Sequence, residues 1–238
     1  MNKNDEFLIV LKNAFTRFLK TSARSNEKLK ILHAYITKDL CRLLGMEKYL
    51  YYSLGFQDGK EVCITGRYMD KKVDITIKDK KDNKAICGLA IKFVMSNYSQ
   101  NSNNYFENML GETANIRSNN IPYFQVFCVF DTLPYFDKSG RIKKWEQITE
   151  HNIGKYLKLS NDNIDFYYHT PNKTLLYLIH LEHVAKEKIT TKKEYISYYL
   201  KNNFEFSCSA LKFSFGNTVV YNDYELFLNK VMYTIKSR

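Results

Sequence analysis

The stretches Lys71-Lys-Val-Asp-Ile-Thr-Ile77 and Ala85-Ile-Cys-Gly-Leu-Ala-Ile-Lys-Phe-Val94 predict the two β-strands that decide the fold. In the first stretch, three aliphatic residues alternate with Asp74 and Thr76. This period of two places the aliphatic side chains on one face of the strand and Asp74 on the other. The polar run between the stretches, residues 78–84, has Asn and Asp where a turn is needed. We therefore expect one hairpin.

The second strand is apolar almost throughout, and a lysine, Lys92, interrupts it. A strand this apolar is expected to be buried on both faces, so a lysine inside it needs a reason. One reason is structural: the stem packs along the sheet and the ammonium reaches its edge. The other is chemical, because Asp74 on the neighbouring strand would lie a few ångströms away. Phosphodiester hydrolysis needs carboxylates that hold Mg²⁺ and a cation that stabilises charge near the phosphorus.

These residues resemble the motif of the restriction-endonuclease-like superfamily, an Asp near the end of one strand and Glu-x-Lys on the next. Asp74 matches the Asp, Lys92 matches the Lys, and Ala90 stands at the position of the motif Glu. The resemblance extends from about Glu61 to Trp145 and is greatest to small bacterial type II restriction enzymes. It implies an α/β fold with a restriction-endonuclease-like mixed β-sheet flanked by helices. It also implies sequence-specific, Mg²⁺-dependent hydrolysis of double-stranded DNA.

The resemblance also implies roles for single residues. Asp74 would bind Mg²⁺, an acid at position 90 would bind the same ion, and the carbonyl of Ile91 would add a ligand. Lys92 would orient the attacking water. Cutting both strands of a palindromic site suits a homodimer with two-fold symmetry. The alternatives are a non-specific or repair nuclease of the same fold, and a catalytically inactive DNA-binding protein.

Three explanations for Ala90 remain open at this point. The alanine is an engineered replacement of a motif glutamate, made to trap the enzyme on uncut DNA. Alternatively, the acid has moved to the following helix, where Glu107 is the candidate ligand and Glu112 lies behind it. In the third explanation the chain has lost catalysis and only binds DNA.

The segment after the lysine strand is rich in carboxamides. Asn and Gln side chains can bond adenine in the major groove, and the helix expected next offers N–H groups to a phosphate. A helix-capping role would account for one or two of these amides but not for all of them. We therefore predict DNA contacts from Asn97, Gln100, Asn101, Asn103 and Asn104.

Composition is compatible with a nucleic-acid partner without requiring one. The 238 residues contain 36 Lys and Arg against 25 Asp and Glu, a formal charge of +11, which can supply phosphate contacts. With three prolines and nine glycines there is no obvious linker, so we expect a single endonuclease domain. We divide it into N-terminal helices (1–56), a catalytic core (about 57–160) and a C-terminal helical and strand region (161–238).

The cysteines and the hydropathy pattern predict a cytoplasmic location. The five cysteines are odd in number and lack Cys-x-x-Cys spacing, which is typical of reduced, small core residues. No apolar run is long enough to span a membrane.

Periodicity predicts the remaining elements. Helices are expected at 5–20, 26–44, 47–54, 103–118, 143–158, 190–202 and 222–236, and strands at 61–68, 72–78, 85–95 and 123–130, with strand-like pieces at 164–169 and 205–215.

Two further sets of residues are weaker metal candidates. His180 and His183 have a spacing that could share a metal ion, but no third ligand follows at zinc-site spacing, so ordinary histidines are favoured. Glu61 opens the strand before Asp74, either as an edge carboxylate or as the ligand of a second metal ion.

Overall fold

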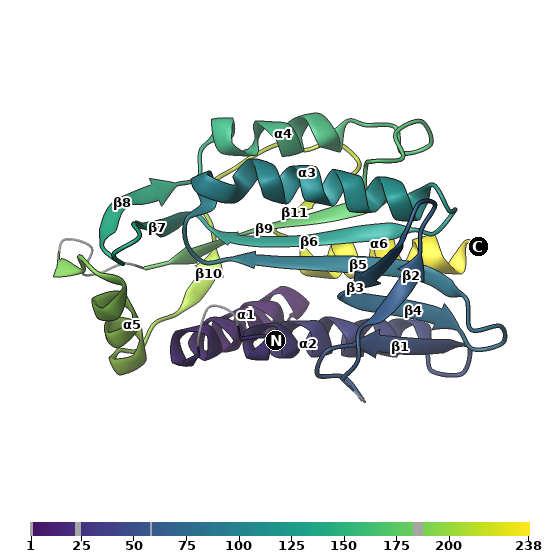
Figure 1. Cartoon of the computed structure of the whole chain (residues 1–238), viewed down its shortest axis with the longest axis horizontal. Helices are drawn as coiled ribbons and strands as arrows, with labels where there is room; N and C mark the ends of the chain where they lie inside the picture. The colour runs from purple at the N-terminus through teal and green to yellow at the C-terminus, as the bar shows by residue number, and fades with distance from the viewer. Residues whose placement is uncertain (1, 22–24, 58, 183–187) are drawn as a thin grey trace.

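A mixed β-sheet with helices on both faces forms the centre of the molecule (Figure 1). The computed structural model describes residues 2–21, 25–57, 59–182 and 188–238. Within these residues the sheet has seven strands. This architecture confirms the predicted α/β class with a mixed sheet flanked by helices.

The sheet is antiparallel at its two sides and parallel in the middle. From one edge to the other the order is β1 (Tyr49–Ser53), β4 (Ile75–Asp79), β5 (Ala85–Val94), β6 (Tyr123–Phe130), β9 (Lys173–Leu181) and β10 (Phe206–Cys208), with β11 (Val219–Tyr221) also paired to β9. Strands β5, β6 and β9 run parallel, whereas β4 is antiparallel to β5 and β10 to β9. The sheet therefore takes strands from all three segments into which the sequence was divided.

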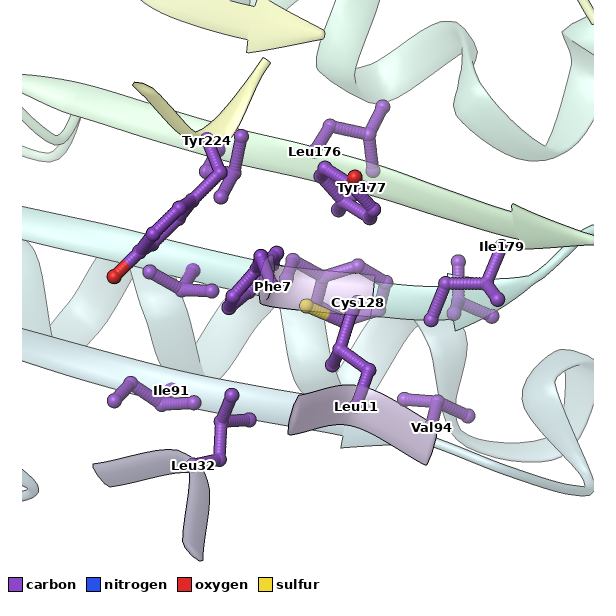
Figure 2. Close-up of a cluster of buried hydrophobic side chains, with 14 of the residues drawn as sticks. Phe7, Leu11, Leu32, Ile91, Val94, Cys128, Leu176, Tyr177, Ile179 and Tyr224 are labelled. Carbon is purple, nitrogen blue, oxygen red and sulfur yellow. The ribbon is translucent and has the colours of Figure 1, made fainter. Parts of the chain in front are cut away.

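Helices cover both faces of the sheet (Figure 1). One face carries α1 (Lys3–Lys20), α2 (Glu27–Leu44) and α6 (Tyr224–Lys236), the other carries α3 (Tyr98–Arg117) and α4 (Glu150–Ser160), and α5 (Lys192–Lys201) packs at the end of the sheet beside α1. Because successive side chains of a strand point to opposite faces, β6 contributes to both cores. Phe127 packs on Tyr105 and Tyr156 of the α3 and α4 layer. Cys128, next along the strand, lies in the core beneath α1 (Figure 2).

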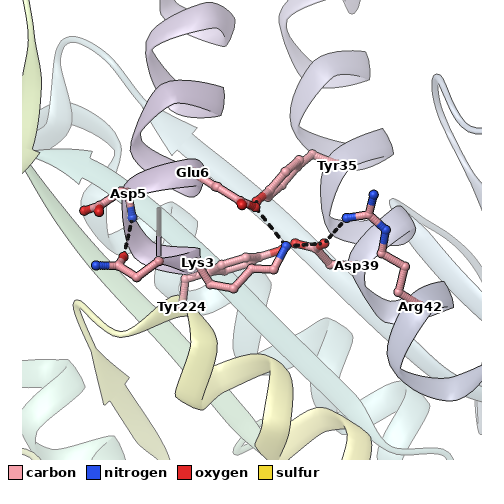
Figure 3. A network of polar contacts seen from close by, with 8 residues as sticks. Lys3, Asp5, Glu6, Tyr35, Asp39, Arg42 and Tyr224 are labelled. Carbon is pink, nitrogen blue, oxygen red and sulfur yellow. Dashed lines mark hydrogen bonds and ion pairs between the residues drawn. The ribbon is translucent and has the colours of Figure 1, made fainter.

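A buried polar network ties the helices α1, α2 and α6 together (Figure 3). Asp39 of α2 is 2% exposed, accepts a hydrogen bond from Lys3 Nζ at 2.9 Å and another from Tyr224 Oη at 3.2 Å. Lys3 also contacts Glu6, which accepts a hydrogen bond from Tyr35. Because a buried carboxylate is stable only when it is paired and hydrogen-bonded, this network fixes how the three helices sit on the sheet.

Two hairpins stand outside the main sheet. They are β2 (Val62–Thr65) with β3 (Asp70–Val73), and β7 (Thr132–Phe136) with β8 (Ile142–Gln147). The first hairpin crosses close over β5 at Gly88, where an added Cβ would lie 2.8 Å from the side chain of Ile64. Because β2 packs so close to β5 here, position 88 has room only for glycine.

Several predicted elements are confirmed, among them the helices at 5–20, 26–44, 190–202 and 222–236 and the strands at 85–95 and 123–130. The helix predicted at 47–54 is wrong, because these residues form β1 and pair with β4. The helix predicted at 143–158 is wrong in its first part, which is β8. The strand-like piece at 164–169 is a series of turns. Strand β9, in the middle of the sheet, was not predicted.

Two errors concern the candidate site. The strand predicted at 72–78 is interrupted at Asp74, where the chain leaves the hairpin partner β2 and joins the main sheet as β4. The helix predicted at 103–118 begins at Tyr98, so most of the carboxamides lie inside its first turns. Helices that could cross a membrane are absent from the described ranges.

Candidate active site

A groove of about 570 Å³ opens beside the strand that carries Lys92. Its floor is formed by the Asp74 bend and the middle of β5, and its walls by the beginning of α2 and by α3. Basic, acidic and aromatic side chains share the lining, among them Lys28, Lys71, Lys72, Asp74, Ala90, Lys92, Tyr105, Asn108, Glu112 and Gln125. The structure therefore brings Asp74, Ala90 and Lys92 to one place, as the two strands predicted.

Asp74 is held at the edge of β5 by a backbone hydrogen bond. The paired register of β4 and β5 ends at Ile75 and Leu89, so β4 no longer reaches Ile91. The N–H of Ile91 donates instead to Asp74 Oδ2, at 2.6 Å. The N–H and C=O of one strand residue point to the same side, so the Ile91 carbonyl also faces the side of Asp74. The bend thus places one carboxylate and one carbonyl together.

Burial raises the pKa of Asp74 to about 6. The nearby carboxylates of Glu61 and Glu112 contribute to this raised pKa, and the Ile91 hydrogen bond and the charge of Lys92 oppose it. A buried carboxylate beside other carboxylates is costly to ionise unless a cation joins it. Perturbed carboxyl groups of this kind are found at functional sites more often than elsewhere.

The replacement Asp74→Asn is expected to stabilise the metal-free protein above about pH 6. The folded-state pKa of about 6 exceeds the ordinary aspartate value of 3.8, so between these values the unfolded chain loses its proton first. Stability therefore falls as the pH rises through this window, by on the order of 2 to 3 kcal/mol once both states are ionised. Asparagine keeps an acceptor for Ile91 and carries no charge, so the variant escapes this loss.

Urea unfolding in the presence of a chelator measures the effect. The variant and the unchanged chain should have nearly equal unfolding free energies at about pH 4 and differ at about pH 7.5. Asp70→Asn, at an exposed position on β3, is the control and should show no such difference. Equal pH dependence of the Asp74 variant and the unchanged chain would refute the argument.

Lys92 projects from β5 into the groove, on the face opposite Ile91. Its side chain is exposed, and Nζ lies 4.6 Å from the centroid of the Tyr105 ring on α3. An ammonium group over an aromatic face is attracted by the ring, and this attraction orients the lysine side chain. The ammonium group therefore points toward α3, and it lines the same groove as Asp74.

A glutamate of α3, Glu112, lines the same groove as Ala90. Ala90 lines the groove beside Gln125, its register partner on β6. Glu112 on α3 lines the same groove and is close enough to raise the pKa of Asp74. Its carboxylate contacts Lys71 Nζ at 2.5 Å and accepts a hydrogen bond from Tyr123 Oη at 3.2 Å.

The structure places Glu107 away from the groove. Five residues rotate a helix by about 140°, so Glu107 and Glu112 point in different directions from α3. Glu107 is exposed and does not line the groove. Burial lowers the pKa of Lys155 on α4, and the negative charge of Glu107, which favours the protonated ammonium, opposes this shift. Glu107, the candidate ligand expected on this helix, therefore lies outside the groove, whereas Glu112, expected behind it, lines the groove.

The carboxamides divide into two groups on the helix. Asn97 caps α3 with φ of 52°, and both ends of its amide bond the backbone of Phe136, at 2.8 and 3.1 Å. Asn103 faces α4, where its oxygen accepts a hydrogen bond from Lys155. These two amides have structural partners.

The other amides lie on the groove side of α3. Asn101 precedes the groove-lining Tyr105 by four residues, and Asn104 precedes the groove-lining Asn108 by four, and such neighbours share a helix face. Asn101 bonds Tyr105, and Asn104 is exposed. Gln100 accepts a hydrogen bond from Asn97 at 3.3 Å. An amide-bearing face thus leads along α3 to Glu112.

The sequence did not single out His33, which lies beside Asp74. It is fully buried on α2, and burial lowers its pKa to about 4. Its Nδ1 is 3.8 Å from Glu61 Oε1, and the pKa of Glu61 is raised by burial. In the sequence His33 occupies a core position of an amphipathic helix. Only the folded structure shows that its imidazole lies close to the carboxylates of Glu61 and Asp74.

The structure describes one of the two histidines that were considered as a metal pair. His180 Nδ1 lies 3.0 Å from Asp131 Oδ2, which also accepts a hydrogen bond from Ser209. His183 lies outside the described residues. Among the cysteines, Cys87 and Cys128 are buried as expected, whereas Cys63 and Cys208 are exposed.

Comparisons with protein-family models, curated proteins and solved structures found no significant match.

Proposed function

We propose that this chain is a type II restriction endonuclease that hydrolyses both strands of a short, specific DNA site with Mg²⁺. The observation that supports this function most directly is the meeting of Asp74, Lys92 and Glu112 in one basic groove. They come from a bend, a strand and a helix, so the arrangement does not follow from proximity in the sequence. It combines the carboxylates and the cation that phosphodiester hydrolysis requires.

The chemistry of the donor set fits Mg²⁺. This ion prefers oxygen ligands and commonly takes one or two carboxylates while it keeps several waters. Asp74 and Glu112 would hold it, with the Ile91 carbonyl as a further oxygen, and the groove has room for water and a phosphate. When bound, the ion would polarise the phosphate and lower the pKa of a coordinated water.

The protein's own groups orient the reaction. The backbone N–H of Ile91 holds Asp74 Oδ2, and the other carboxylate oxygen, Oδ1, would bind the ion. Lys92 would orient the attacking water and stabilise the charge that develops on the phosphate. Lys71 forms an ion pair with Glu112. When Mg²⁺ binds Glu112 in place of this ammonium, Lys71 would be free to contact a phosphate of the DNA. Lys28 and Lys72 add positive charge along the same groove.

Recognition of bases would come from the amide-bearing face of α3. Asn101 and Asn104, with Gln100 at the exposed end, lie in line with the groove and can offer donor and acceptor together to adenine. Asn97 and Asn103 would act by fixing the helix to β7 and α4. Because α3 carries both these amides and Glu112, contacts between the amides and the bases would position the proposed metal ligand and so couple recognition to cleavage.

The proposed reaction implies partners and a location. Cleavage of both strands of a palindrome suits a homodimer, because two-fold symmetry presents the same site to each strand. Double-stranded DNA in the cytoplasm is the expected substrate, and the free thiols suit that reducing compartment.

Incubation with long phage DNA tests the function. In the presence of Mg²⁺ and at fixed salt, discrete fragments are expected, and a chelator should abolish them. A smear would instead identify a non-specific or repair nuclease of this architecture. If neither this chain nor its Ala90→Glu variant cleaves while both bind DNA, the chain is a DNA-binding protein without catalysis.

A further inference from the structure

Three potential metal ligands converge behind the groove, on the side of α2. His33, Glu61 and Asp74 each offer one ligand atom, and these atoms all lie within 4.8 Å of one another. They come from α2, from the residue before β2 and from the bend between β3 and β4. Three separate segments therefore direct a nitrogen and two carboxylate groups at one point.

His33 has no hydrogen-bonding partner in this position. The residue is 0% exposed, and neither ring nitrogen makes a hydrogen bond within the described structure. The 3.8 Å between His33 Nδ1 and Glu61 Oε1 is too long for a hydrogen bond. A buried polar group without a partner destabilises the folded state, so such groups in a native fold call for an explanation. Here the nitrogen faces two carboxylates across a gap.

A cation between these groups would explain both features. Ligand atoms around an ion with bond lengths of about 2.0 to 2.2 Å lie roughly 3 to 4 Å apart, so small side-chain movements would close the site. The ion would give the imidazole a partner and would offset the repulsion between Glu61 and Asp74.

The donor set indicates which ion. Imidazole is a ligand that suits transition metals, whereas Mg²⁺ prefers an all-oxygen site. We propose that His33, Glu61 and Asp74 form a binding site for a divalent transition-metal ion such as Mn²⁺. The site is adjacent to the groove and shares Asp74 with it. To that extent the inference rests on the proposed function, although binding is measurable without DNA.

A spectroscopic measurement on the unchanged chain tests the site directly. Electron spin-echo modulation of bound Mn²⁺ should show a coordinated ¹⁴N nucleus, and the signal should survive roughly a hundredfold excess of Mg²⁺. Bound Mn²⁺ without nitrogen modulation, or no Mn²⁺ binding at all, would overturn the proposal. This readout needs no variant and so does not depend on one folding.

Variants add a second readout. His33→Gln should lose the nitrogen modulation and weaken Mn²⁺ binding at least about tenfold, in line with the loss of a ligand-shell interaction. His151→Gln, at an exposed position on α4, is the matched control and should bind Mn²⁺ as the unchanged chain does. Retention of the nitrogen signal in folded His33→Gln would refute the assignment.

The two proposals fail in different ways. A protein that cleaves DNA with Mg²⁺ but shows no nitrogen ligand to Mn²⁺ keeps the proposed function and loses this site. A protein that binds Mn²⁺ through His33 but cleaves no DNA keeps this site and loses the proposed function.

Discussion

Replacement of Lys92 by methionine is expected to slow Mg²⁺-dependent DNA cleavage by about a thousandfold, since it removes the cation that stabilises charge at the phosphate. Methionine loses the cation over the Tyr105 ring but retains an unbranched stem of similar length and a thioether that packs on aromatic rings, so the fold should persist. Binding to the same DNA should change by no more than about tenfold. One charge is a small share of the electrostatic affinity of a basic protein for DNA.

Single-turnover cleavage and DNA affinity, both at fixed salt, separate these effects. Lys84→Met is the matched control, because Lys84 lies in the exposed turn of the same hairpin, where its partner is Asp82. It should cleave like the unchanged chain. If Lys92→Met lowers unfolding free energy substantially while folded protein still cleaves, Lys92 is a structural residue whose ammonium only reaches the edge of the sheet.

The second large effect is expected from Glu112→Gln, which should lower cleavage at least about a hundredfold by removing a metal ligand. Glutamine has nearly the same shape and keeps an acceptor for Tyr123. Glu107→Gln removes the same charge from the same helix, but on the side of α4, and should leave cleavage unchanged. The pair of variants therefore tests position on α3 and not charge alone.

Ala90→Glu completes this test. If Glu112 is the second acid, the chain with Ala90 cleaves DNA and a glutamate at position 90 is not needed. The opposite result, an inactive Ala90 chain that gains several orders of magnitude from Ala90→Glu and ignores Glu112→Gln, would show that alanine replaces an essential acid. Both results are read in the same cleavage assay.

The local pattern of apolar residues was sufficient to predict the helices and strands that carry a clear periodicity or a continuous apolar run. The apolar stripes of α1 and α2 and the continuous apolar runs of β5 and β6 predicted their type correctly, since period and length differ between helix and strand. The same pattern placed Asp74 and Lys92 together, because adjacent strands of a hairpin must pair. A groove with these two residues was therefore accessible from the sequence.

Elements that depend on distant partners were not predictable in this way. Residues 49–53 form a strand because β4 pairs with them, and β9 lies in the middle of the sheet because β6 pairs with it. Tyrosines such as those in β1 favour a strand, but this preference depends strongly on the neighbouring strands, and here the partner is β4.

The composition of the site beyond Asp74 and Lys92 was decided by tertiary structure. Which carboxylate on α3 faces the groove depends on the rotation of the helix, and packing on β6 turns Glu112 inward and leaves Glu107 outside. His33 of α2 comes close to Asp74 only in the folded chain, where their ligand atoms lie within 4.8 Å of each other. The sequence by itself determined the paired strands and the chemistry they bear. Only the packing of helices on the sheet, which is set by contacts between residues far apart in the chain, decided which further carboxylate and imidazole groups lie near them.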